Sequence, residues 1–224
     1  MHMNPDNFGE RRKVMVRRLR AEGFVKTHRV EKAMETVPRE LFLPESMAPE
    51  AYVDSPLPIG GGQTISAPHM VAIMQEELEL APGQKVLEIG GGSGYHAAVT
   101  AELVKPGGKV FTIERISELA EAAKANLQKA GYSQMVEVVL GDGSKGLPSE
   151  APFDRIFVAC GAPMVPAPLT AQLAEGGIML VPVGGRQCQD LVKVRKRGGR
   201  VTQQSRGGCI FVPLIGEHGY DCGR

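Results

Sequence analysis

A glycine-rich turn with an acidic residue just before it is the first feature of the sequence that could do chemistry. A short apolar run, 85–89, leads directly into this turn. Its glycines form a G-x-G-x-G pattern at Gly90, Gly92 and Gly94. Dinucleotide-binding loops have G-x-G-x-x-G and present backbone N–H groups to a pyrophosphate. Here the third glycine comes one residue earlier, and Glu88 precedes the first. A carboxylate at this place repels phosphate but suits a ligand with a cationic amino group and a sulfonium.

Two further acidic residues stand at the ends of the next apolar runs. Glu114 follows the run 109–113, and Asp142 lies between two glycines after the run 136–140. Glu114 can accept hydrogen bonds from both hydroxyls of a ribose, and Asp142 can accept one from the exocyclic amine of adenine. A glycine turn alone can be purely conformational. Together with the two acidic residues, however, the turn predicts a site for the nucleoside sulfonium S-adenosylmethionine and hence methyl transfer.

A polar run before the predicted sheet points to an anionic acceptor for the methyl group. The glycines at 60–62 lead through Gln63 and Thr64 to Ser66 and His69, where a helix is predicted to begin. Free N–H groups at a helix N-terminus favour an anion, and the Ser66 hydroxyl could donate to a carboxylate. In the alternative interpretation Ser66 only caps the helix, His69 is structural, and Gln63 and Thr64 satisfy the loop backbone. Both interpretations stay open on spacing alone.

Strands and helical segments alternate through the middle of the chain. Strands separated by helical crossovers predict an α/β fold: a doubly wound, mostly parallel sheet with helices on both faces. The N-terminal helical region should break at Gly23, with Thr27 capping its second helix. We expect helices in 10–36, 66–80, 96–104, 117–130 and 166–174, and strands in 85–89, 109–113, 136–140, 154–159 and 178–183.

The two ends of the chain differ from this alternation. The segment 49–62 is rich in Pro and Gly and is expected to be irregular. Gly198 and Gly199 read as a hairpin turn between 191–197 and a strand that begins at Val201. We also expect a strand at 210–215. The sequence therefore predicts one domain, 1–224, with an N-terminal helical appendage (1–62), a cofactor-binding core (63–185) and antiparallel C-terminal strands (186–224).

Composition makes a polyanion an unexpected partner, because the 224 residues carry a formal net charge of only +1. A local basic cluster could still contact phosphates. Its structural alternative, which we favour, is a solvated edge hairpin whose charges prevent pairing with another strand. The cluster consists of Lys193, Arg195, Lys196, Arg197 and Arg200.

Compartment and metal content follow from the polar start of the chain and from its cysteines. Residues 1–10 contain no apolar run, which argues against a secretory signal. No stretch reaches the roughly 18 apolar residues of a membrane span. The cysteines lack C-x-x-C spacing, so we expect free thiols in a reducing, cytoplasmic environment and no metal site. They are Cys160, Cys188, Cys209 and Cys222.

Several segments resemble the protein-L-isoaspartate O-methyltransferase family. Segment 59–70 is similar to the family's most specific signature, through Gln-Thr-Ile-Ser-Ala-Pro-His, and 86–95 is similar to its cofactor loop. Position 61 is commonly bulky or aromatic in the family but is Gly61 here, which bears on peptide affinity and not on the reaction type. Further similar segments, at 37–42, 153–156 and 211–214, extend the resemblance over residues 10–220.

The resemblance implies a protein repair enzyme that methylates the free α-carboxylate of L-isoaspartyl residues in damaged proteins and peptides. Ser66 would be the catalytic residue at that carboxylate, with Ala67, His69 and Val212 also binding the substrate. It further implies S-adenosylmethionine as cofactor, with no metal, nucleic acid or membrane partner. The cofactor-binding residues would be Gln63, Thr64, Ile65, Glu88, Gly90, Gly92, Gly94, Glu114, Arg115, Asp142 and Gly143.

Such a reaction needs no general base, because the acceptor carboxylate is already ionised at neutral pH. The enzyme must orient the carboxylate and remove its water without pairing it with a strong cation, and the Ser66 hydroxyl suits this task. The alternatives are methylation of nucleic acid or a small molecule, and a receptor that binds isoaspartyl proteins without turnover. The segment 160–163 lacks the Asn/Asp-Pro-Pro-aromatic pattern of base-amino methyltransferases, and the complete cofactor set argues against a receptor. We expect a monomer, because a peptide substrate needs open access.

Overall fold

The strands form two sheets in the computed structural model, which describes residues 7–221. The smaller sheet is a hairpin of β1 (Leu57–Gly60) and β2 (Gln63–Ile65). The larger sheet contains β3 (Lys85–Ile89), β4 (Lys109–Glu114), β5 (Val136–Leu140), β6 (Phe153–Val158), β7 (Leu173–Gly184), β8 (Gln189–Arg197) and β9 (Arg200–Cys209).

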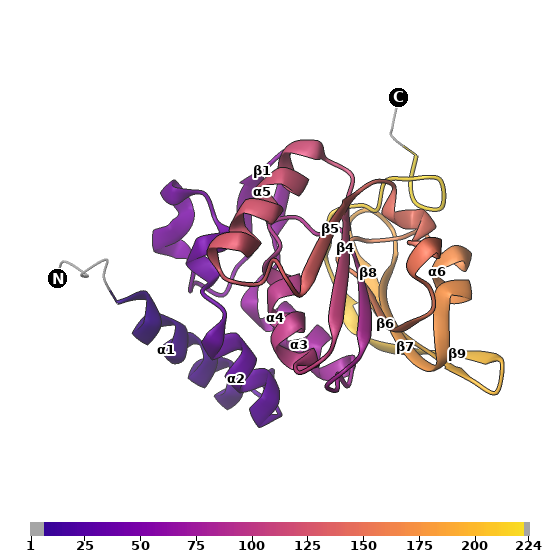
Figure 1. Cartoon of the computed structure of the whole chain (residues 1–224), viewed down its shortest axis with the longest axis horizontal. Coiled ribbons are helices and arrows are strands. Elements are labelled where there is room, and N and C mark those ends of the chain that lie inside the picture. The colour runs from indigo at the N-terminus through magenta and orange to yellow at the C-terminus, as the bar shows by residue number, and fades with distance from the viewer. Residues whose placement is uncertain (1–6, 222–224) are drawn as a thin grey trace.

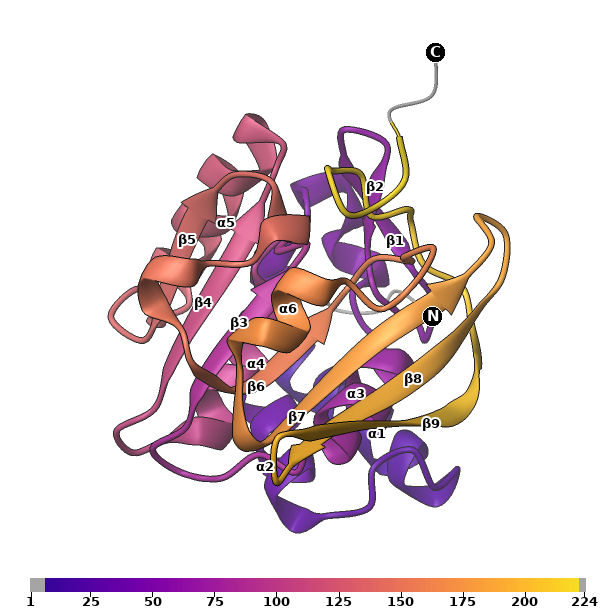
Figure 2. The same ribbon diagram turned by 90° about the vertical axis from the view of Figure 1, so that its right-hand side faces the viewer.

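The large sheet has the order β5-β4-β3-β6-β7-β8-β9, and Figure 2 shows β5 at one edge and β9 at the other. Neighbours from β5 to β7 are parallel, whereas β8 pairs antiparallel with both β7 and β9. From β3 the chain adds β4 and β5 on one side of the sheet and then β6 and β7 on the other, so the strand order reverses at β3. An open α/β sheet binds its ligand at such a reversal point. The predicted doubly wound parallel sheet and the added antiparallel C-terminal strands are both confirmed.

The helices cover both faces of the sheet, as expected (Figure 1). On one face, α3 to α5 pack on the strands with α1 and α2 outside them, and Val71, Leu103 and Leu127 belong to one apolar core. On the other face, α6 and the C-terminal segment contribute Leu169 and Leu214 to a second core. The α-helices are α1 (Phe8–Ala21), α2 (His28–Thr36), α3 (Pro68–Glu77), α4 (Tyr95–Val104), α5 (Ser117–Lys129) and α6 (Ala167–Gln172).

The N-terminal appendage packs on the main domain through α1 and α2. Gly23 has a φ of +81° between the helices, and the Thr27 hydroxyl accepts a hydrogen bond from the Val30 N–H at 3.3 Å, so the expected break and cap are confirmed. Short 3₁₀ turns at Arg39–Phe42 and Glu45–Glu50 then lead to the β1–β2 hairpin.

Three expectations about local structure are wrong. The segment 49–62 is not irregular throughout, because glycines with positive φ at 60–62 close the β1–β2 hairpin. The segment 210–215 is not a strand: it makes only isolated bridges, from Pro213 to Gly161 and from Ile215 to Tyr220, and proline lacks the N–H that a ladder requires. The helix expected at 166–174 ends earlier, since β7 already begins at Leu173 and continues through two glycines.

Three absences hold for residues 7–221. No helix in this range is both long and apolar enough to cross a bilayer. No group of three or more His, Cys, Asp or Glu side chains is placed there to hold a metal ion. Cys160, Cys188 and Cys209 are free thiols in the described part of the chain, whereas Cys222 lies outside it.

Candidate active site

A pocket opens at the carboxyl ends of β3 and β4, beside the point where the strand order reverses. Its empty space, including the open mouth, is about 770 Å³. The β1–β2 hairpin and the C-terminal segment both lie at this end of the sheet (Figure 2). The lining includes Gln63, Thr64, Ile65, Ser66, Val71, Glu88, Gly90, Gly92, Tyr95, His96, Glu114, Arg115, Gly143, Cys160 and 212–215.

The glycine loop has no room for side chains. Gly90 has a φ of +87°, and a Cβ there would lie 2.5 Å from the Cys160 Sγ. A Cβ on Gly143, at the end of β5, would lie 2.6 Å from Ile89. Gly94 does not line the pocket. It precedes α4 with a φ of +87° and packs against Leu127. The backbone is thus exposed to a ligand at Gly90, Gly92 and Gly143.

Glu88 presents an unused hydrogen-bonding atom. The residue is fully buried, its Oε2 accepts from the Thr112 hydroxyl at 2.6 Å, and its Oε1 has no partner. Burial raises the pKa of Glu88 to about 8. The Thr112 hydrogen bond opposes this shift, and the charge of the nearby Glu114 adds to it. A buried polar atom without a partner is costly, and a cationic group beside it would favour the ionised carboxylate. Glu88 therefore suits the ammonium group of a ligand.

Glu114 is held rigidly at the tip of β4. Its Oε2 accepts from the Gly92 N–H and its Oε1 from the Ile116 N–H, each at 2.9 Å. Each carboxylate oxygen can accept more than one hydrogen bond, so Glu114 can still receive two hydroxyl groups. The carboxylate and the glycine loop thereby fix each other's position.

Asp142 holds the C-terminal segment. Its carboxylate accepts from the Ser144 N–H at 2.9 Å, the Ser144 hydroxyl at 2.7 Å and the Glu217 N–H at 2.9 Å, and it does not line the pocket. Burial would raise the pKa of Asp142, but these bonds from Glu217 and Ser144 outweigh it and hold the pKa below its ordinary value. Asp142 anchors the C-terminal segment, whose return to β5 could not be read from the sequence.

Ser66 lines the pocket, and it does not cap α3. Asp54 takes that role: its Oδ1 accepts from the His69 N–H at 2.9 Å and lies 2.9 Å from the His69 ring Nδ1. The interpretation of Ser66 as a mere cap is therefore wrong. Within residues 7–221 its hydroxyl has no hydrogen-bond partner, while its carbonyl accepts from the Arg39 Nη2 at 2.9 Å. Ala67 and His69 lie next to the pocket but outside its lining.

Several lining residues were missed by reasoning from the sequence. Tyr95 and His96 follow the glycine loop in the first turn of α4, and Cys160 follows β6, so the rule that ligands bind at strand ends could have found them. Burial, with the neighbouring Arg39 acting in the same direction, lowers the pKa of His96 to about 3, so the imidazole is neutral. Burial, strengthened by Glu114 and Glu88, raises the pKa of Cys160 to about 12. The resemblance pointed to Val212, and its neighbours 213–215 line the pocket as well.

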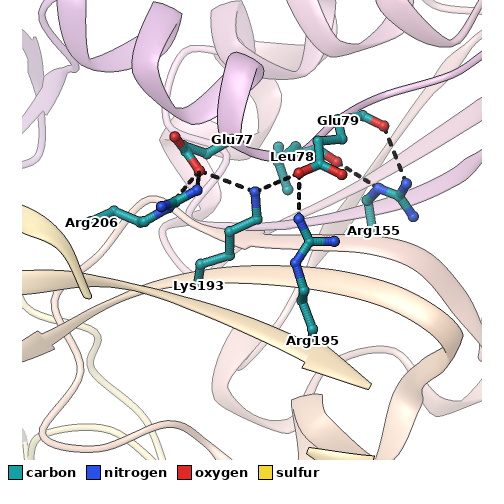
Figure 3. A network of polar contacts seen from close by, with 7 residues as sticks. All are labelled: Glu77, Leu78, Glu79, Arg155, Lys193, Arg195 and Arg206. Atoms are coloured by element: carbon teal, nitrogen blue, oxygen red, sulfur yellow. Dashed lines mark hydrogen bonds and ion pairs between the residues drawn. The ribbon is translucent and has the colours of Figure 1, made fainter. Parts of the chain in front are cut away.

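The basic cluster of β8 and β9 is not fully solvated. Lys193 is buried, and its Nζ lies 3.0 Å from Glu77 and 2.9 Å from Glu79, at the C-terminal end of α3 (Figure 3). Arg195 also pairs with Glu79, and Lys196 donates to the Leu173 carbonyl at 2.8 Å. Solvation was therefore the wrong expectation for Lys193. The alternation of β8 directs it toward α3, where carboxylates neutralise it.

The parallel sheet with an acidic glycine loop at its reversal point defines a Rossmann-like transferase of the class that handles nucleoside ligands. A model of the family described as Protein-L-isoaspartate(D-aspartate) O-methyltransferase (PCMT) matches residues 10–219. The chain belongs to this family.

Individual relatives agree with this assignment over nearly their whole lengths. A protein-L-isoaspartate O-methyltransferase of Methanopyrus kandleri is 58% identical over 214 residues, which is 95% of each chain. One of Hyperthermus butylicus is 53% identical and covers 95% of this chain and 92% of its own. A crystal structure of the Plasmodium falciparum enzyme with S-adenosyl-L-homocysteine superimposes with a TM-score of 0.83 at 26% identity, and covers 91% of this chain and 98% of its own.

Proposed function

We propose that the chain transfers a methyl group from S-adenosylmethionine to the free α-carboxylate of L-isoaspartyl residues in damaged proteins and peptides. The observation that carries this proposal is that one pocket contains both the unpartnered Glu88 oxygen and the unpartnered Ser66 hydroxyl. The Glu88 oxygen suits the cationic end of the cofactor, and the Ser66 hydroxyl suits the anionic acceptor. The names and sequence identities of the relatives support the same reaction.

The residues present fit this cofactor, which when bound supplies an electrophilic methyl group on a sulfonium. Glu88 would accept from its amino group, because the Oε1 atom lacks a partner. Glu114 would accept from the ribose hydroxyls, and the backbone of Gly143 would lie beside the adenine. Gln63, Thr64, Ile65, Gly90, Gly92 and Arg115, which all line the pocket, would complete the cofactor-binding surface.

Ser66 would hold the acceptor carboxylate. A neutral hydroxyl can replace water at a carboxylate oxygen without lowering its nucleophilicity as much as an arginine would. The N–H of Ala67, which has no partner within residues 7–221, and the lining residue Val212 would bound the same subsite. His69 would hold α3 in place instead of binding substrate, since Asp54 already engages both its N–H and its ring.

The test is a methyl-transfer assay with labelled S-adenosylmethionine and two peptides that differ only in Asp or isoAsp at one position. We expect label only in the isoAsp peptide, as a base-labile ester. Label in both peptides, or in neither while S-adenosylhomocysteine still binds, would contradict the proposal. The second outcome would favour a receptor without turnover.

We further propose that the chain works as a monomer in the cytoplasm and without nucleic acid. The engagement of Lys193 and Arg195 by Glu77 and Glu79 removes the main support for phosphate contacts. Sedimentation at micromolar concentration should give the mass of one chain. A mobility shift with single- or double-stranded DNA would speak against this part of the proposal.

A further inference from the structure

Arg39 is a fully buried cation for which the proposed reaction has so far required no role. It lies in the segment 37–42, at the start of the 3₁₀ turn Arg39–Phe42. No carboxylate among residues 7–221 lies within 4.0 Å of its guanidinium group. Burial lowers the pKa of Arg39, yet an arginine keeps its proton in proteins. A buried charge without an ion pair costs several kcal/mol, so its hydrogen bonds must matter.

Two hydrogen bonds and one contact with an aromatic ring connect Arg39 to three parts of the molecule. The Arg39 Nε donates to the Ala51 carbonyl at 2.8 Å, and Nη2 donates to the Ser66 carbonyl at 2.9 Å. The guanidinium carbon lies 4.9 Å from the centroid of the Tyr95 ring, in the first turn of α4. Arg39 thus ties the appendage to the residue after β2 and to the helix that follows the glycine loop.

The bond to Ser66 falls on the peptide group that follows this pocket-lining residue. That peptide joins the Ser66 carbonyl to the Ala67 N–H, and the N–H has no partner within residues 7–221. A charge-assisted donor on a carbonyl polarises the whole amide and makes its N–H a stronger donor. Held in this way, the Ser66 hydroxyl and the Ala67 N–H form a pair of donors at the N-terminal end of α3, which suits an anion.

We propose that Arg39 is a positioning residue for the acceptor carboxylate: by binding the Ser66 carbonyl it fixes the Ser66 hydroxyl and polarises the Ala67 N–H that together hold the carboxylate. This inference rests on the proposed function. Arg39 itself stays behind the peptide, so its charge does not pair with the nucleophile.

A purely structural role for Arg39 makes a different prediction. If Arg39 only stabilises the fold, its replacement should change activity independently of Ser66, and the effects of the two substitutions should multiply. If Arg39 acts through Ser66, the two effects should overlap, as is general for residues that share one interaction.

The experiment is a double-mutant cycle of Arg39→Lys and Ser66→Ala, with kcat and KM measured for an isoAsp peptide. Lysine keeps the charge but lacks the planar fork that reaches both carbonyls. We expect each single variant to lower kcat/KM by about 10- to 100-fold. In the Arg39→Lys background, Ser66→Ala should cost only about 3-fold more. The affinity for S-adenosylhomocysteine, measured by calorimetry, should change by less than about 3-fold in every variant.

Arg29→Lys is the matched control. Arg29 also donates to two backbone carbonyls, those of Leu80 (2.8 Å) and Leu103, but it does not line the pocket. Its replacement should leave kcat/KM unchanged even if the melting temperature falls. Multiplying effects of Arg39→Lys and Ser66→Ala would overturn the inference. If wild type labels neither peptide, the proposed function fails, which is distinct from a failure of the cycle.

A measurement on the wild-type protein keeps the inference testable if Arg39→Lys does not fold. With S-adenosylhomocysteine bound, addition of the isoAsp peptide should move the Ala67 amide proton downfield in an NMR spectrum. The Asp peptide should leave it in place. An Ala67 resonance that ignores the isoAsp peptide would overturn the inference.

Discussion

The Asp54 carboxylate accepts the backbone N–H of His69 at 2.9 Å and lies at the same distance from the His69 ring Nδ1. A residue twelve positions before Ser66 therefore caps α3. As a result, the serine that the local sequence would assign to the cap keeps its hydroxyl free beside the pocket.

Because Asp54 caps α3 and Ser66 does not, alanine substitutions at the two positions should have opposite effects on stability and activity. Asp54→Ala removes the cap and should lower the free energy of unfolding by about 1 kcal/mol, measured by urea denaturation. Ser66→Ala should change it by less than about 0.5 kcal/mol while abolishing most methyl transfer. A large loss of stability in Ser66→Ala would instead indicate that Ser66 caps α3.

Glu88 should make both stability and cofactor binding depend on pH. Its pKa is about 8 in the folded protein, above the ordinary 4.5, because it is buried. Between these two values the folded protein keeps a proton that the unfolded chain releases, so the free energy of unfolding falls as pH rises. Glu88→Gln should remove this fall, seen in urea unfolding at several pH values across the window.

The same shift governs binding of the cofactor. An ionised Glu88 attracts a cationic amino group, so the affinity for S-adenosylhomocysteine should rise as pH approaches 8, with release of a proton on binding. Glu88→Gln should weaken binding by about 10- to 100-fold and flatten the dependence. Calorimetry in buffers of different ionisation enthalpy measures both effects. Equal pH dependence in variant and wild type would exclude Glu88 as the titrating group.

The contact between Gly90 and Cys160 predicts a partial rescue. Gly90→Ala places a Cβ 2.5 Å from the Cys160 Sγ and keeps a φ of +87°. The left-handed backbone alone costs about 1–2 kcal/mol for a residue with a side chain. S-adenosylhomocysteine affinity should fall at least about 10-fold, and a second change, Cys160→Ala, should recover only part of it. No recovery at all would show that the sulfur is not the obstacle.

Lys193 should contribute far more to stability than its neighbours in the basic cluster. Lys193→Met removes a buried ammonium group from the partly buried Glu77 and the half-exposed Glu79, which keep Arg206 and Arg195, and should lower the free energy of unfolding by about 2 kcal/mol. Arg197→Ala, at an exposed position, should change it by less than about 0.5 kcal/mol. Urea unfolding measures both. Equal small effects would mean that water screens the Lys193 pairs.

The parts of the molecule that follow local rules were predictable from the sequence. Apolar runs and helix breakers placed β3, β4 and α5 nearly at their observed bounds, because each depends on its own residues. The glycine loop, Glu88 and Glu114 were found by the rule for strand ends, and all of them except Gly94 line the pocket.

The parts that depend on distant partners were not predictable. Nothing in 141–143 shows that Glu217 returns to Asp142. Lys193 looked solvated because its carboxylate partners lie at the end of α3, far back in the chain. Spacing alone left Ser66, the nearest hydroxyl, as a possible cap on α3, whereas Asp54 reaches the helix from the preceding loop.

One wall of the pocket is made by residues 212–215, and the Glu217 N–H binds Asp142 just beyond them. These residues are synthesised after every other part of the site, since chains are made from the N-terminus onward. A nascent chain can therefore build the glycine loop early, but its pocket stays open on one side until residue 217 has emerged. Competence for catalysis should thus arrive only once this wall of the pocket is in place.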